Sequence, residues 1–84
     1  MTSSVFGKIN MKELTLRKFI FKEVLSVDLE EISDTSGTRY EVNVYTLNDE
    51  QEPQNLVYKF EVQSLGVALS TFENKVNMLT GLVS

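Results

Sequence analysis

Apolar and polar residues alternate along most of the first two thirds of this chain. Within Leu14–Ile32, the odd positions of Phe19–Leu29 are mainly apolar and the even positions mainly polar. A period of two is typical of a β-strand with one buried face. The sequence predicts either one long bent strand with a bulge near Arg17–Lys18, or two strands joined tightly near Lys22–Glu23. A helix over Met11–Leu25 is the alternative.

Two further stretches alternate more regularly, and both are predicted to be strands. They are Thr38–Leu47, "TRYEVNVYTL", and Asn55–Val62, "NLVYKFEV". The apolar positions of one face are Tyr40, Val42 and Val44 in the first stretch, and Leu56, Tyr58, Phe60 and Val62 in the second. The short polar residues of Ser33–Gly37, "SDTSG", predict a hairpin turn before the first of them.

The last twenty residues change to a period of three to four. The apolar positions that repeat are Leu65, Leu69, Phe72, Val76, Leu79 and Val83. This spacing forms one face of an amphipathic helix, and Gly81 is a plausible stop. Its start is open: Ser64 can cap the helix early, whereas Ser70 with Glu73 forms a capping box that delays it.

Together these elements predict an α+β fold. It is an antiparallel β-meander of three or four strands with one C-terminal helix packed on one sheet face. We expect residues 1–84 to form a single domain, with residues 1–10 as a flexible arm. The sheet face expected under the helix carries Phe19, Phe21, Leu25, Val27, Leu29, Tyr40, Val42, Val44, Tyr58 and Phe60.

Composition narrows the chemistry. The 84 residues include no cysteine and no histidine, which removes thiol chemistry, the most frequent general base and the commonest transition-metal ligand. We therefore expect no enzymatic activity, cofactor or metal site. No apolar run approaches the ~20 residues of a membrane span. No basic start followed by an apolar block resembles a signal peptide. A cytoplasmic protein without membrane contact is expected.

Two groups of acidic residues are candidate metal sites. Asp49, Glu50 and Glu52 lie in the polar segment Asn48–Asn55, which contains the only proline. The segment lacks the spacing and central glycine of a calcium loop, so it is interpreted as a link between strands and as a rim contact for a basic partner. The second group is interpreted as a solvated surface, because its members do not share one strand face: Asp28, Glu30, Glu31 and Asp34.

Charge is divided unevenly along the chain. Residues 1–22 contain five basic residues and one acidic residue, a net charge of +4, whereas residues 23–84 carry −8. The basic segment "RKFIFK" mixes cations with aromatic residues, as single-stranded nucleic-acid sites do. Arg17, Lys18 and Lys22 are the candidate contacts for such a module. The overall charge of −4 opposes binding to a polyanion, and the two oppositely charged parts can instead pair with each other in the fold.

The sheet face away from the helix carries the main functional hypothesis. An open antiparallel face is usually polar, yet six apolar residues are expected there: Ile20, Val24, Ile32, Tyr45, Leu47 and Val57. They predict a protein interface, or a surface covered by Val5, Phe6 and Ile9 of the N-terminal arm. We expect a small non-enzymatic interaction module that forms homodimers and acts as an inhibitor or adaptor of the kind phages encode. The alternatives are the nucleic-acid module and an assembly component whose helix packs on a neighbour.

Overall fold

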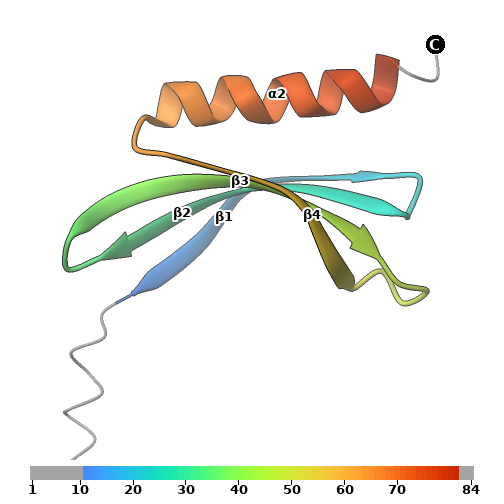
Figure 1. Cartoon of the computed structure of the whole chain (residues 1–84), viewed down its shortest axis with the longest axis horizontal. Coiled ribbons are helices and arrows are strands. Elements are labelled where there is room, and N and C mark those ends of the chain that lie inside the picture. Colours follow the sequence, from blue (N-terminus) through green and yellow to red (C-terminus); the bar gives the residue numbers. More distant parts are fainter. Residues whose placement is uncertain (1–10, 82–84) are drawn as a thin grey trace, which may run out of the picture.

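The computed structural model describes residues 11–81 of the chain. Four antiparallel strands form one sheet in the order β1-β2-β3-β4, and one helix lies across a single face of it (Figure 1). The elements are β1 Lys12–Phe21, β2 Leu25–Asp34, β3 Gly37–Leu47, β4 Pro53–Val62 and α2 Leu65–Gly81. The predicted α+β meander with a C-terminal helix is therefore confirmed, and the sheet has four strands.

The stretch that the sequence left open consists of two strands joined by a tight turn. Lys22 and Glu23 have positive φ angles of 51° and 61°, and the Val24 amide donates to the Phe21 carbonyl at 3.0 Å. These angles let the chain reverse within three residues. The register of β1 shifts between Thr15 and Arg17, close to the expected bulge. No helix forms here.

Side chains that bond to their own backbone build the other two connections. Asp34 Oδ1 accepts from the Ser36 amide at 2.8 Å, and Gly37 takes a φ of 133°, which a residue with a Cβ rarely adopts. In the acidic connection, Asn48 Oδ1 accepts from the amides of Glu50 and Glu52, both at 2.9 Å. The segment thus contains a compact loop ordered by one asparagine.

The hydrophobic core lies between the sheet and α2. Its buried members are Val27, Leu29, Val42, Val44, Ala68 and Phe72. The partly buried residues packed on it are Leu16, Phe19, Leu25, Tyr40, Tyr58, Phe60, Val62, Leu69, Val76 and Leu79. Ser64 begins the helix, because its hydroxyl accepts from the Val67 amide at 3.3 Å. The early helix start is therefore the one observed.

Bulges in β4 change the side to which its first residues belong. Val44 pairs with Tyr58, but the next residue, Tyr45, pairs with Leu56, so Val57 is an extra residue. Because one extra residue reverses the alternation, Leu56 leaves the helix-covered face and is 51% exposed. The predicted grouping of Leu56 with Tyr58 is wrong for this reason.

The residues 1–10 that were expected to form an arm, including the apolar residues proposed to cover the second face, lie outside the described residues. No helix within residues 11–81 is long and apolar enough to span a membrane.

We predict that the core beneath α2 dominates the stability. Leu29→Ala should lower the free energy of unfolding by about 2–5 kcal/mol, because the fully buried side chain leaves a cavity. Leu56→Ala is the matched control and should cost less than about 1 kcal/mol, since Leu56 is half exposed. Urea unfolding measures both values. Equal losses for the two variants would contradict the assignment of faces.

Candidate functional site

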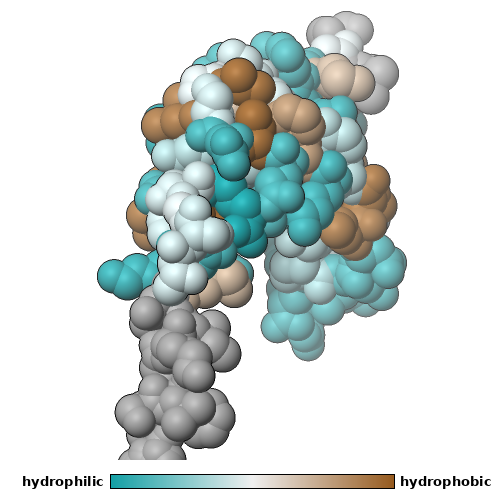
Figure 2. All heavy atoms as spheres, turned by 60° about the vertical axis from the view of Figure 1, so that its left-hand side comes forward, coloured by the Kyte–Doolittle hydropathy of each residue, from teal (hydrophilic) through white to brown (hydrophobic). Residues whose placement is uncertain are grey.

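The sheet face away from α2 is the candidate functional surface. β3 arches beneath the helix (Figure 1), and hydrophilic residues gather around the hollow below the arch (Figure 2). The strand register arranges this face in three rows that cross all four strands. The rows are Thr15–Glu30–Glu41–Glu61, Lys18–Asp28–Asn43–Lys59 and Ile20–Ser26–Tyr45–Leu56. Two polar rows therefore lie beside one mainly apolar row.

The middle row is held together by opposite charges and hydrogen bonds. Asp28 is only 4% exposed, and its carboxylate accepts from the Ser26 hydroxyl at 2.5 Å. Lys18 Nζ lies 3.5 Å from the other carboxylate oxygen of Asp28. A buried carboxylate needs such partners to offset the loss of water. Lys18 of the basic segment is thus paired with an acid from the acidic part of the chain.

A second network surrounds Glu41, which is also buried. Lys59 Nζ lies 3.6 Å from Glu41 Oε2, and the Asn43 amide group donates to Glu41 Oε1 at 3.3 Å. Arg39 Nε lies 3.9 Å from Glu41 Oε2, and Arg39 also pairs with Asp34 at 3.0 Å and with Glu61. These contacts offset the repulsion expected where carboxylates lie opposite one another on neighbouring strands.

Glu30 on this face has no ion pair among the described residues. Glu30 lies between Thr15 and Glu41 in the first row. Burial is the largest cause that raises the pKa of Glu30, and the charges of Asp28, Glu13 and Glu41 raise it further. Burial and the same group of acids also raise the pKa of Tyr45. Lys18 lowers the pKa of Glu30, but its effect does not cancel the effects of burial and of the neighbouring acids.

Apolar residues collect at one end of the same face, near the β1–β2 turn and the β3–β4 loop. The backbone joins these two connections, because the Leu47 amide donates to the Val24 carbonyl at 2.8 Å. We call this surface the end patch, and it consists of Ile20, Val24, Tyr45, Leu47, Leu56 and Val57. Ile20, Val24, Leu56 and Val57 are exposed, whereas Tyr45 and Leu47 are half-buried.

The end patch contains five of the six residues predicted for a protein interface. The sixth, Ile32, pairs with Glu13 and Arg39 toward the opposite end of the face and is buried. The polar rows separate it from the end patch. Sequence reasoning missed Leu56, since the bulge that exposes it leaves no glycine or other local signal in β4.

The predicted nucleic-acid contacts do not form one surface. Arg17 pairs in register with buried Leu29, and Lys18 pairs with Asp28 on the face away from α2. Lys22 lies in the β1–β2 turn, with its ammonium group 5.4 Å from the centre of the Phe21 ring. The three cations therefore point in different directions, and one of them is neutralised within the fold.

The buried polar residues of the middle row were also not foreseen. Asn43 is 2% exposed, and its Oδ1 has no hydrogen-bond partner among the described residues. Alternation placed Asn43 correctly on the polar face, but alternation does not reveal that curvature and long neighbouring side chains bury that face. No group of three or more acidic side chains in residues 11–81 is arranged to hold a metal ion.

Comparisons of the chain with protein-family models, curated proteins and solved structures found no match in any of the three.

We predict that the charge of Glu30 destabilises the fold at neutral pH. A carboxyl group whose pKa is raised in the folded state favours folding most at low pH, where it is protonated. This contribution to the free energy of unfolding is lost as the pH rises through the unfolded and then the folded pKa of the group. Glu30→Gln should therefore raise the melting temperature at pH 7, and the increase should shrink below pH 4.5. Thermal unfolding from pH 3.5 to 7.5 measures the effect.

The matched control is Glu31→Gln, which removes the same charge from the opposite face of β2. A gain of equal size in the control, or a Glu30→Gln gain that does not depend on pH, would contradict the electrostatic explanation.

Proposed function

We propose that this protein is a small, non-enzymatic interaction module that associates with a second copy of itself through the end patch. The observation that carries the proposal is the mainly apolar row at one end of a sheet face that no element of residues 11–81 covers. Ile20 and Leu56 occupy its two edge strands, with Tyr45 between them. Covering this surface would stabilise a complex by about 25 cal/mol for each Å² of apolar area.

The charges around the end patch favour a second copy as the partner. Its β1 side carries Lys22 of the turn, whereas its β3–β4 side carries Asp49, Glu50 and Glu52 of the loop. A two-fold contact whose axis runs parallel to the strands would place each side of one copy against the other side of its partner. Lys22 of each copy would then face the acidic loop of the other, and such complementarity supports both association rate and register.

Tyr45 suits the centre of such a contact. An aromatic residue at an interface buries a large area at little entropic cost and keeps a polar tip. Its ring belongs to the apolar row. Its hydroxyl is protonated at neutral pH and can donate a hydrogen bond, because burial and the nearby carboxylates raise its pKa further above the ordinary value. An inhibitor or adaptor role would extend the same mechanism, surface complementarity, to a different protein.

A single-stranded nucleic-acid module is the competing function. Arg17 and Lys22 remain available for phosphates, but the acidic loop lies at the same end of the molecule as Lys22, and Lys18 already pairs with Asp28. These arrangements weaken the electrostatic attraction on which such binding depends. A labelled single-stranded oligonucleotide that binds at physiological salt, and binds less tightly to Arg17→Gln, would favour this alternative.

The first test introduces charge into the end patch. Ile20→Lys combined with Val57→Lys should convert dimers into monomers, because two ammonium groups per chain would have to be desolvated in the contact. Sedimentation equilibrium measures the association, and circular dichroism verifies the fold. Both side chains are exposed, so the fold should tolerate the changes.

The control variant, Leu14→Lys with Val67→Lys, adds the same charge at exposed apolar positions outside the end patch. It should dimerise as the wild type does. A wild type that remains monomeric at millimolar concentration, or two variants that dissociate equally, would exclude the end patch as the interface.

The second test addresses the rims. Lys22→Glu should weaken dimerisation about two- to fivefold, since a partly exposed ion pair contributes ~0.2–1 kcal/mol, and two-fold symmetry can increase the loss. Adding Glu50→Lys to Lys22→Glu should restore the association. Dissociation constants at 50 and 500 mM salt measure the effect. A double variant weaker than the single variant at low salt would contradict the two-fold arrangement.

A further inference from the structure

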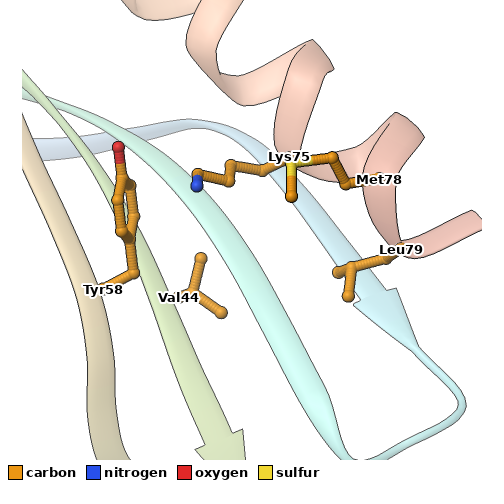
Figure 3. Close-up of a pocket in the computed structure, with 5 residues that line it drawn as sticks. All are labelled: Val44, Tyr58, Lys75, Met78 and Leu79. Atoms are coloured by element: carbon orange, nitrogen blue, oxygen red, sulfur yellow. The ribbon is translucent and has the colours of Figure 1, made fainter. Parts of the chain in front are cut away.

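A separate cavity lies on the helix-covered side of the sheet. It has a volume of about 170 Å³ and is lined by Val44, Tyr58, Lys75, Met78 and Leu79 (Figure 3). The three helix residues lie at spacings of three and four and therefore share one face of α2. Four of the five residues that line the cavity are apolar or aromatic. An engineered apolar cavity of about 150 Å³ accommodates benzene, so this space suits one aromatic ring or one branched aliphatic group.

The shape of β3 and β4 explains why this space is not filled. The register shifts just beyond the Val44–Tyr58 pair, where the sheet bends, while α2 continues straight above it (Figure 1). The ends of β3 and β4 next to their connecting loop turn away from the helix (Figure 1). Met78, which could close the gap, is 60% exposed.

Two hydrogen-bond donors stand beside this apolar space, and neither has an acceptor within residues 11–81. Lys75 Nζ lies 3.8 Å from the centre of the Tyr58 ring, a cation–π contact that fixes the ammonium group. Among the described residues, Lys75 forms no ion pair and the Tyr58 hydroxyl forms no hydrogen bond. Both polar ends are drawn on the same side of the cavity in Figure 3.

We propose that this cavity binds a free small carboxylic acid whose body is one aromatic ring or one branched aliphatic chain. The body would fill the space between Val44, Met78 and Leu79. The carboxylate would accept from Lys75 Nζ and from the Tyr58 hydroxyl, and charge-assisted hydrogen bonds of this kind are the stronger ones. This proposal does not depend on dimerisation, because the cavity and the end patch lie on opposite faces of the sheet.

The test is a chemical-shift titration of the full chain with benzoate and 4-methylpentanoate, each compared with its uncharged alcohol, benzyl alcohol and 4-methylpentan-1-ol. Saturable shifts should centre on the lining residues. At 50 mM salt each acid should bind about five- to tenfold more tightly than its alcohol, and 500 mM salt should reduce that ratio. Millimolar affinities are expected for ligands of about nine non-hydrogen atoms.

Three variants locate the interaction. Lys75→Gln should remove the preference for the acid and leave the affinity for the alcohol unchanged, and Tyr58→Phe should reduce the preference in part. Lys59→Gln is the matched control, because it removes a lysine from the opposite face and should leave the preference intact. Because Tyr58 packs on the core, the salt dependence of the wild type and the Lys75→Gln result decide the question if Tyr58→Phe proves unstable.

Several results would overturn the proposal. Acid and alcohol binding with equal affinity would show an apolar gap without anion recognition, and shifts that do not saturate would show no site. A preference unchanged by Lys75→Gln would place the anion elsewhere. A short peptide ending in leucine that binds more tightly than either acid would assign the cavity to a protein C-terminus instead.

Discussion

The constraint on which this structure depends is that one helix can cover only one face of a four-stranded sheet. α2 buries Val27, Leu29, Val42 and Val44 against Phe72, and this contact provides the hydrophobic core. The opposite face must therefore be stable without a second layer. Its polar rows achieve this through internal pairing, with Lys18 on Asp28 and Lys59 on Glu41. No element of the described chain covers the apolar row, and its side chains cannot be stabilised by ion pairs.

The internal pairing explains why the uneven charge of the sequence does not produce a basic surface. Lys18 lies in the basic first quarter of the chain, and antiparallel pairing of β1 with β2 brings it to Asp28. Part of the uneven charge distribution is thus neutralised by ion pairs that stabilise the open face. The charges of Lys22 and of the loop containing Asp49 are not paired in this way within residues 11–81. They lie at the two sides of the end patch, where they can contribute to recognition.

Much of this architecture could be predicted from the pattern of residues, because a period of two and a period of 3.6 report burial on one face. The alternation placed Val42, Val44 and Phe60 under the helix correctly. It also placed Tyr45 on the other face. The alternation could not show that the chain turns at Lys22 and Glu23, since neither residue type is typical of a positive φ. Burial of Asn43 was equally hidden, because it results from curvature and from the neighbours that three other strands supply.

In β4, too, the sequence pattern could not predict which residues belong to the candidate site. A single extra residue, Val57, reverses the alternation and turns Leu56 toward the open face, beside Tyr45. No local sequence feature requires this bulge, whose cause lies in the register between β3 and β4. The same irregularity accompanies the bend that leaves the cavity between Tyr58 and the last turns of α2. One local change of register therefore adds an apolar residue to one face of the sheet and leaves space on the other. Closing the bulge would return Leu56 to the helix side, where its side chain would occupy part of that space. One feature of the backbone thus enlarges the surface proposed for a partner and accompanies the cavity proposed for a ligand.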